Sequence, residues 1–148
     1  MQVEGLNARF GKIAIFKLTK KPSIMKKVRS FKELDVYKLA RELSKEIFEV
    51  SKKFPKEETY SLTDQMRRAS RSIGAQVAEA WGKRKYEKHF VSKLTDSYSE
   101  QLETQHWIVS AHDCSYLNAK QADTLSAKCV SIGNMLDSMM AKSSWFCE

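Results

Sequence analysis

The 148-residue chain carries 26 Lys and Arg against 18 Asp and Glu, and it contains only five Gly and two Pro. So few turn-forming residues exclude a loop-rich or all-β protein, and the length suits one domain with a substantial core. The three Cys residues form no CxxC pair, which argues against a disulfide framework or a zinc site and indicates reduced thiols in the cytoplasm. The longest N-terminal apolar run, residues 13–16, is too short for a membrane span or a secretory signal.

The positive charge is concentrated at the N-terminus. Residues 1–30 carry eight Lys or Arg and one acid, a net charge of +7, whereas residues 31–148 carry 18 against 17, a net charge of +1. Residues 1–24 show neither helical nor strand periodicity, and Met25 with its basic successors resembles a natural start. We therefore expect residues 1–24 to be a disordered extension and residues 25–148 to form the domain.

The first amphipathic helix is predicted over residues 31–54. Ser30 and Glu33 form a capping box at its start, and Pro55 follows its end. The spacing of its apolar residues, alternating between three and four, is that of a helix packed on one side. The stripe consists of Val36, Ala40, Leu43, Ile47, Val50 and Phe54.

A second helix is predicted over residues 61–82. Ser61 and Asp64 offer another capping box, and Gly82 suits the left-handed conformation that ends many helices. The stripe consists of Leu62, Met66, Ala69, Ile73, Val77 and Trp81 or Ala80.

Two further helices are expected over residues 86–115 and 119–142, with Asn118 as the cap of the second. Their stripes are Phe90, Val91, Leu94, Tyr98, Leu102 and Trp107 or Val109, then Leu125, Cys129, Ile132, Leu136 and Met139 or Met140. Four helices joined by short loops lie antiparallel to their neighbours. The predicted fold class is therefore all-α, an up-down-up-down four-helix bundle.

The second predicted helix is rich in small residues, with Ser72, Gly74, Ala75, Ala78 and Ala80 inside nine positions. They fall largely beside the apolar stripe, where they would let another helix approach closely, within or between subunits. An isolated bundle has little use for several small faces. This favours an oligomer with Gly74, Ala75, Ala78 and Ala80 at its interface; the alternative is that they are simply good helix formers.

Between residues 67 and 93 there are eight cations and only two acids. The predicted nucleic-acid-binding residues are Arg67, Arg68 and Arg71 on one side of the second helix and Lys83, Arg84, Lys85 and Lys88 across the following turn. We expect two separate patches that contact phosphates, since no recognition helix for base edges is present. Tyr86 remains open as a base-stacking residue, Arg71 has a rival role in pairing with an acid across an interface, and a solvated helix face is the simplest alternative.

Residues 34–84, with the pattern FP-E-Y-LT-Q-RRA--SI, and the ETQ of residues 103–105 resemble the four-helix-bundle proteins encoded within intervening sequences of bacterial 23S ribosomal RNA genes. The resemblance covers about residues 31–142; Gln76 and Ala80 depart from the Asn and Gly usual in the family. It implies a homopentamer with a basic surface that binds nucleic acid or a nucleoprotein, and no enzymatic activity. The family is similar to the accessory protein of diversity-generating retroelements, which implies a partner such as a reverse transcriptase.

Two sequence patterns resemble those of metal or catalytic sites, but neither is complete. Glu103 and His106 have the Glu-x-x-His spacing of di-iron bundles, but such sites need a second motif and further carboxylates, for which only Glu79 is a candidate. Cys114 and its His and Asp neighbours diverge around a helix, so they form no nucleophilic dyad. We predict no metal, cofactor or catalytic residue, a polar contact between helices for Glu103, and a core position for Cys129.

Two functions from different classes therefore remain. The first is a non-enzymatic, oligomeric nucleic-acid-binding or nucleoprotein-scaffold protein. The alternative is a protein-interaction or structural oligomer with no nucleic-acid role, in which the surface cations only aid solubility. An uncharacterised catalytic bundle is a third, weaker interpretation.

Overall fold

The computed structural model describes residues 28–147, so the predicted extension of residues 1–24 lies outside the described residues. Four long helices dominate this part of the chain: α2 (Asp35–Ser51), α3 (Leu62–Gly82), α4 (Glu87–Asp113) and α5 (Ala119–Ala141). Three short segments accompany them, the 3-10 turns η2 (Phe31–Glu33) and η3 (Lys56–Glu58) and the helix α6 (Ser143–Phe146). The prediction of an all-α protein with four long helices is confirmed.

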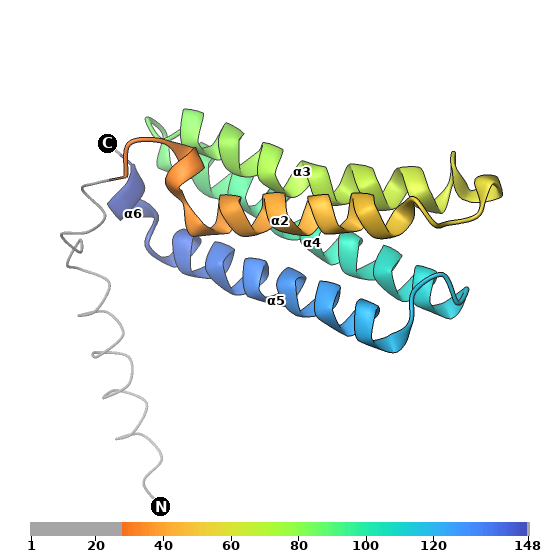
Figure 1. Cartoon of the computed structure of the whole chain (residues 1–148). Helices are drawn as coiled ribbons and strands as arrows, with labels where there is room; N and C mark the ends of the chain where they lie inside the picture. The colour runs from red at the N-terminus through yellow and green to blue at the C-terminus, as the bar shows by residue number, and fades with distance from the viewer. Residues whose placement is uncertain (1–27, 148) are drawn as a thin grey trace, which may run out of the picture.

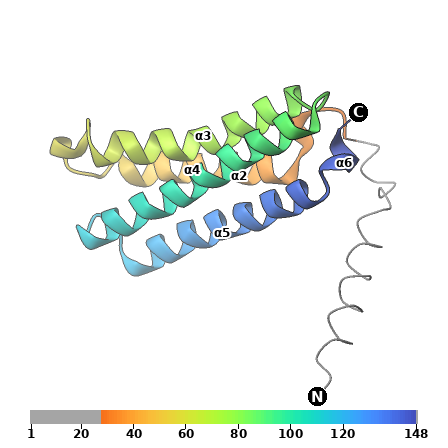
Figure 2. The ribbon, with the colours of Figure 1, turned by 180° about the vertical axis from the view of Figure 1, so that it is seen from behind.

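The four long helices lie side by side, and the chain turns back at each end of the molecule (Figure 1). Each packs against two of the others: α3 contacts α2 and α4, and α5 contacts α4 and α2. Seen from behind, α4 runs between α3 and α5 and lies in front of α2 (Figure 2). One long side of α2 and one of α3 therefore share a face that the other two helices leave open.

The first predicted helix is divided in two. The Ser30 hydroxyl accepts a hydrogen bond from the backbone of Lys32 (3.3 Å), and Glu33 Oε2 accepts one from the backbone of Arg29 (3.0 Å). These hydrogen bonds stabilise the turn η2 and not the start of α2, because Leu34 adopts an extended conformation with a ψ of 131°. The break turns Leu34 into the core, where it is 7% exposed, and α2 begins at Asp35.

Glu58, and not Ser61, caps the second helix, so the predicted Ser61 capping box is wrong. Glu58 Oε2 accepts hydrogen bonds from the Ser61 hydroxyl (2.6 Å) and the Leu62 backbone (3.2 Å). Its other oxygen accepts one from the Tyr116 hydroxyl (3.1 Å), which joins the two loops at this end of the bundle. The bonds from Ser61 and Leu62 hold the pKa of Glu58 below its ordinary value, whereas burial and the bond to Glu58 raise the pKa of Tyr116.

The helix ends differ from the prediction at Gly82 and agree with it at Asn118. No described glycine has a positive φ, and α3 ends through Lys83, which has a φ of −104°. The left-handed residue among those described is Ser115, with a φ of 60°, in the loop between α4 and α5. Asn118 caps α5 as predicted, in a reciprocal capping box with Gln121.

The predicted apolar stripes meet in one core except in the second half of α4, where the prediction is wrong. Leu102 and Val109 are 50% and 54% exposed, and α4 buries Gln101, Thr104 and Ile108 there instead. The large, completely buried side chains of the core include Leu43, Ile47, Met66, Ile73, Phe90, Leu94, Ile132 and Leu136. Of the two alternatives at the end of the α3 stripe, Ala80 is completely buried and Trp81 is half-buried. The core thus takes the smaller residue there, and the indole ring covers its edge.

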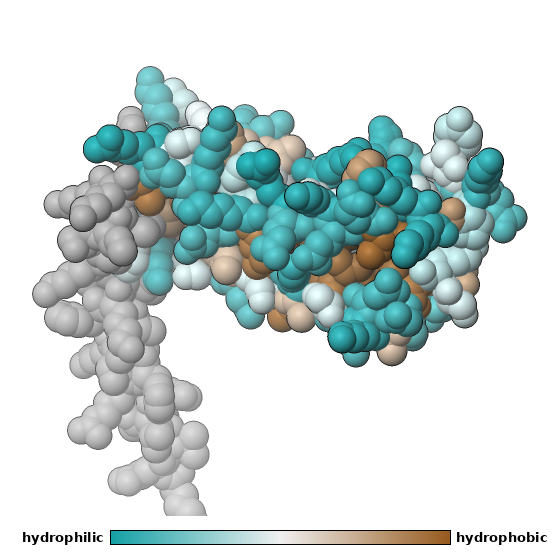
Figure 3. Space-filling view, viewed as in Figure 1, coloured by the Kyte–Doolittle hydropathy of each residue, from teal (hydrophilic) through white to brown (hydrophobic). Residues whose placement is uncertain are grey.

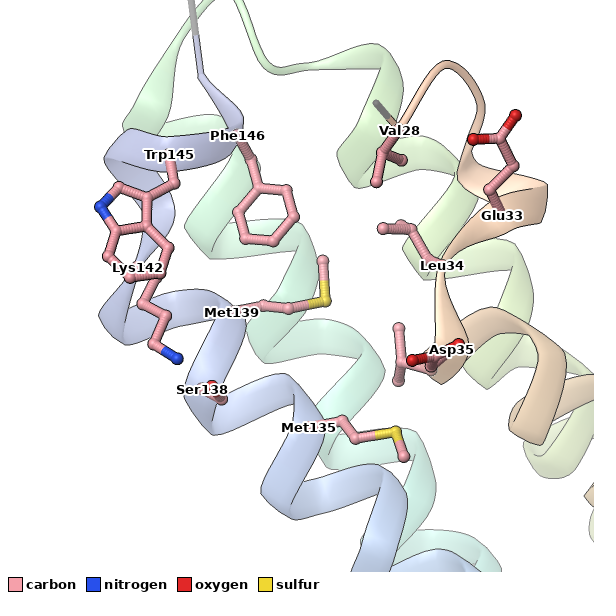
Figure 4. A pocket seen from close by; sticks show the side chains of 11 residues that line it. Val28, Glu33, Leu34, Asp35, Met135, Ser138, Met139, Lys142, Trp145 and Phe146 are labelled. Carbon is pink, nitrogen blue, oxygen red and sulfur yellow. The ribbon is translucent and has the colours of Figure 1, made fainter. Parts of the chain in front are cut away.

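The short helix α6, which the apolar pattern did not predict, closes one end of the bundle. Phe146 stacks on Phe90 with 5.7 Å between ring centres, and the Ser143 hydroxyl donates to the Glu87 carboxylate. Beside it, a pocket of about 400 Å³ opens between the start of α2 and the end of α5 (Figure 4). Met135 and Met139 line this pocket, and Glu33 and Asp35 stand at its edge, so it is unsuited to a polyanion.

Candidate nucleic-acid interface

The predicted cations form two groups at different places along α3. Arg67, Arg68 and Arg71, the α3 arginines, lie in its first half, near the loop from α2. Lys83, Arg84, Lys85 and Lys88, the turn cations, lie at the other end of the molecule, at the turn into α4 (Figure 1). At 1.5 Å per residue, the 16 residues from Arg68 to Arg84 separate the groups by about 24 Å.

The α3 arginines point to different neighbours. Arg67 donates from Nε to the Ser51 hydroxyl (2.7 Å), and its guanidinium carbon lies 4.8 Å from the centre of the Phe48 ring. The guanidinium of Arg71 lies 5.6 Å from the same ring and forms no ion pair within residues 28–147. Arg68 lies 3.8 Å from the Asp64 carboxylate and remains exposed. Arg67 and Arg71 therefore face α2, and Arg71 keeps its charge uncompensated.

Three cations of α2 join this surface, and the prediction from the sequence did not include them. Lys38, Arg41 and Lys45 recur at spacings of three and four residues, so they share one side of α2. Together with Phe48 and Arg71 they line a hollow of about 560 Å³ between α2 and α3. Each of these three cations has an acidic residue nearby in the sequence, so a count of local net charge does not single them out. Their helical spacing is the signal that could have identified them.

Three acids of α2 form ion pairs with lysines. Lys128, which reaches across from α5, forms ion pairs with Glu42 (2.7 Å) and with Glu46. Glu49 pairs with Lys52 at 3.0 Å. Hydrophilic side chains cover the α2 and α3 side of this face, whereas apolar residues show between α2 and α5 (Figure 3).

The turn cations are unequal in what they offer a ligand. Arg84 donates from Nε to the Trp81 carbonyl (2.9 Å), and its guanidinium stacks 3.6 Å from the centre of the Trp81 ring. Lys83 and Lys88 are exposed and have no ion-pair partner in the described part of the chain. Lys85 lies 5.8 Å from the ring of Tyr86, which is 58% exposed and could still stack on a base. Lys83, Lys85 and Lys88 are thus the accessible charges of this group.

Lys93, the last cation of the basic run, is not available to an anion. Its ammonium lies 2.9 Å from the Glu79 carboxylate and 3.5 Å from that of Asp96. These interactions, that with Glu79 foremost, raise the pKa of Lys93. Counting the cations between residues 67 and 93 in the sequence therefore overestimates the positive charge that a ligand can reach.

A model of the family described as 23S rRNA-intervening sequence protein matches residues 32–138 of the chain. The chain belongs to this family. Among solved structures it is similar to a protein of unknown function from the S23 ribosomal protein family of Bacteroides thetaiotaomicron, with 24% identity and a TM-score of 0.65. That match covers 71% of this chain and 94% of the other and shows a shared fold. The search of curated proteins found no match.

The small residues of this 23S rRNA-intervening sequence protein divide into two kinds. Gly74 and Ala80 are buried within the chain; a methyl group on Gly74 would lie 3.5 Å from the Tyr37 ring of α2. The assignment of Ala80 to a subunit interface is therefore corrected, because it packs inside the bundle; Gly74 also borders a hollow of about 300 Å³ beside Tyr37, and its assignment stays a prediction. Ala75 is exposed and Ala78 half-buried, and both line the same hollow. The interface prediction is retained for these two as well.

The residues that suggested other chemistry have structural roles in this family member. Glu103 accepts a hydrogen bond from Trp107 Nε1 (3.2 Å) on its own helix, and the polar contact between helices stays a prediction. No group of three His, Cys, Asp or Glu side chains within residues 28–147 is placed to hold a metal ion. Cys129 is buried, as predicted, and burial raises the pKa of its thiol to about 12. Within the same residues, every helix is too short or too polar to cross a membrane.

Proposed function

We propose that this member of the 23S rRNA-intervening sequence protein family is a non-enzymatic, cytoplasmic nucleic-acid-binding protein that contacts phosphate backbones. The observation that carries the proposal is a set of exposed cations, including Arg71, Lys83 and Lys88, without ion pairs among the described residues. Lys128 meanwhile binds two of the acids of α2, Glu42 and Glu46, and offsets part of their charge. Phosphate contacts supply affinity without reading sequence, so binding is expected to show little base preference.

We further propose that the antiparallel four-helix chain assembles into a ring of five subunits. Exposed Ala75 and half-buried Ala78 support this, because small side chains on an outer helix face allow close approach of a neighbour. Repetition of weak phosphate sites around a ring raises the overall affinity through multivalency. A nucleic-acid-processing protein such as a reverse transcriptase is a further proposed partner of the assembly.

The binding proposal is tested by a salt titration with the full chain and with a chain that starts at Met25. Fluorescence anisotropy with a labelled 20-base-pair duplex measures affinity, and Lys83→Gln with Lys88→Gln removes two unpaired charges. Removing one cation that binds a duplex phosphate lowers the slope of log K against log salt by about 0.9, so the expected change is about 1.8. Lys53→Gln with Lys120→Gln, an equal reduction of exposed charge elsewhere, is the matched control and should leave the slope unchanged.

An unchanged slope in the turn-cation variant would favour the alternative function, a structural or protein-interaction oligomer. The contacts of Arg67 with Phe48 and of Arg84 with Trp81 support that alternative, since both guanidiniums serve the chain's own packing. Loss of all binding in the chain that starts at Met25 would assign binding to residues 1–24.

Light scattering tests the ring. The expected mass is about five times the 17.1 kDa of one chain. Ala75→Glu should dissociate the assembly, while Ala127→Glu on the exposed side of α5 is the control. A monomeric wild-type chain would end the ring proposal but not the binding proposal.

A further inference from the structure

One line of α2 combines cations with an aromatic ring. Lys38, Arg41, Lys45, Phe48 and Lys52 follow each other at spacings of three, four, three and four residues. Such residues stack above one another on a helix, and 14 residues extend the line over about 21 Å. The line runs along the 560 Å³ hollow, whose other wall carries Arg71.

Phe48 organises the cations around it. Its ring centre lies 4.6 Å from the Lys52 ammonium and 4.8 and 5.6 Å from the guanidinium carbons of Arg67 and Arg71. The Ser51 hydroxyl also holds Arg67, so its position is defined before any ligand binds. Guanidinium planes and aromatic rings are the surfaces on which unpaired bases stack.

The charge of this line favours an anion. Glu42 reaches the hollow, but its carboxylate accepts a hydrogen bond from Lys128 of α5. Glu46 is bound to the same ammonium. Lys38, Arg41, Lys45 and Arg71 have no ion-pair partner among residues 28–147. Glu42 and Glu46 share the single charge of Lys128, so the four cations leave an excess of positive charge on the two walls.

The shape of the hollow selects a single strand over a duplex. Two packed helices have axes about 8–10 Å apart, and the furrow between them is too narrow to receive a double helix. The volume of about 560 Å³ lies in the range of sites that hold small organic ligands, about 300–1,000 Å³. A single nucleotide and its phosphates can therefore enter the hollow, whereas a duplex can only contact the side chains along its edges.

We propose that the α2/α3 groove, lined by Lys38, Arg41, Lys45, Phe48 and Arg71, binds single-stranded nucleic acid. The phosphates lie along the cations of α2, and a base packs against the Phe48 ring and the guanidiniums beside it. This inference rests on the proposed function and adds to it the strandedness of the ligand and a second surface, separate from the turn cations. Arg41 and Arg71 also line the hollow of Ala75 and Ala78. The strand therefore occupies the part of the face shared by α2 and α3 that lies toward Phe48, and the proposed ring contact occupies the part toward Tyr37.

The test compares an unstructured single strand, a labelled 20-nucleotide oligothymidylate, with the labelled 20-base-pair duplex. In the full chain, Arg41→Gln with Lys45→Gln should lower the salt slope for the single strand by about 1.4. That change corresponds to about a 25-fold loss of affinity at 0.1 M salt relative to 1 M. Duplex affinity should change by less than about twofold, and Lys53→Gln with Lys120→Gln should leave both probes unaffected.

Phe48→Leu tests the stacking part. It keeps an apolar side chain in place and should weaken single-strand binding by about 5- to 150-fold, while the salt slope stays unchanged. Thermal unfolding of each variant checks that the bundle is intact, and the Arg41 and Lys45 variant carries the test if Phe48→Leu unfolds.

Failure of the groove is distinguishable from failure of the proposed function. If the wild-type chain binds neither probe, both proposals fall. If it binds both and the groove variant behaves like the control, the turn cations bind nucleic acid and the groove does not. An equal loss on both probes overturns the assignment to single strands. A change in the mass of the assembly without loss of binding would show instead that a second copy of the chain covers the groove.

Discussion

Two helical glycines differ in the space available for a side chain, which gives a matched pair of stability predictions. A methyl group on Gly74 of α3 would meet the Tyr37 ring at 3.5 Å and Ala40 at 3.9 Å, which are ordinary contacts. A methyl group on Gly133 of α5 would lie 3.0 Å from Gln101 Nε2, a tight contact that requires Gln101 to shift by a few tenths of an ångström. Gln101 is 2% exposed, and its Oε1 accepts a hydrogen bond from Gln105 (2.7 Å), so it has little freedom to move.

The magnitudes follow from this difference. Replacing Gly by Ala inside a helix stabilises it by about 0.5–1 kcal/mol, because the unfolded chain loses conformational freedom. Gly74→Ala should therefore raise the free energy of unfolding by that amount. In Gly133→Ala the same gain is offset by overpacking, which costs about 1–3 kcal/mol, so the net expectation is a loss of about 1 kcal/mol.

Urea unfolding followed by circular dichroism, at one fixed chain concentration, measures both variants. The expected difference between them is about 2 kcal/mol. Equal stability would show that Gln101 relaxes and that helix propensity decides the outcome, which would refute the packing argument. Light scattering on Gly74→Ala adds a second check, since dissociation of an oligomer would show that Gly74 faces a neighbouring subunit.

Two further predictions concern titratable groups. Because the folded state lowers the pKa of Glu58 from its ordinary value of 4.5, the stability it contributes is present above that pH and is lost as the pH falls below it. Glu58→Gln should therefore lower the unfolding midpoint at pH 7 and reduce its decline below pH 4.5, and identical pH profiles for variant and wild type would contradict this. Ellman's reagent should label exposed Cys114 in the native protein but Cys129 only on unfolding, since burial raises the pKa of the Cys129 thiol to about 12; labelling of native Cys129 would show that α5 opens.

The four long helices followed from the spacing of apolar residues, and the errors arose where distant parts of the chain meet. Ser30 and Glu33 both cap a turn, but with other partners than the predicted box, the backbone groups of Lys32 and Arg29, and that turn is separate from α2 because Leu34 enters the core. Glu58 caps α3 in place of Ser61. The hydroxyl of Tyr116, 58 residues away in the chain, donates a hydrogen bond to the same carboxylate. Local patterns identify a capping residue; they do not reveal a competitor supplied by another loop.

The amino-acid sequence by itself determined the fold class and the positions of the α3 arginines and the turn cations, because helical periodicity and net charge are local properties of a chain. Only the tertiary structure decided which charges and which small residues remain available. Lys128 of α5 pairs with both Glu42 and Glu46, Glu79 pairs with Lys93, and Gly74 and Ala80 are buried inside the bundle. Each outcome depends on a neighbour from another helix, so the α2/α3 groove became visible only once the helices were packed together.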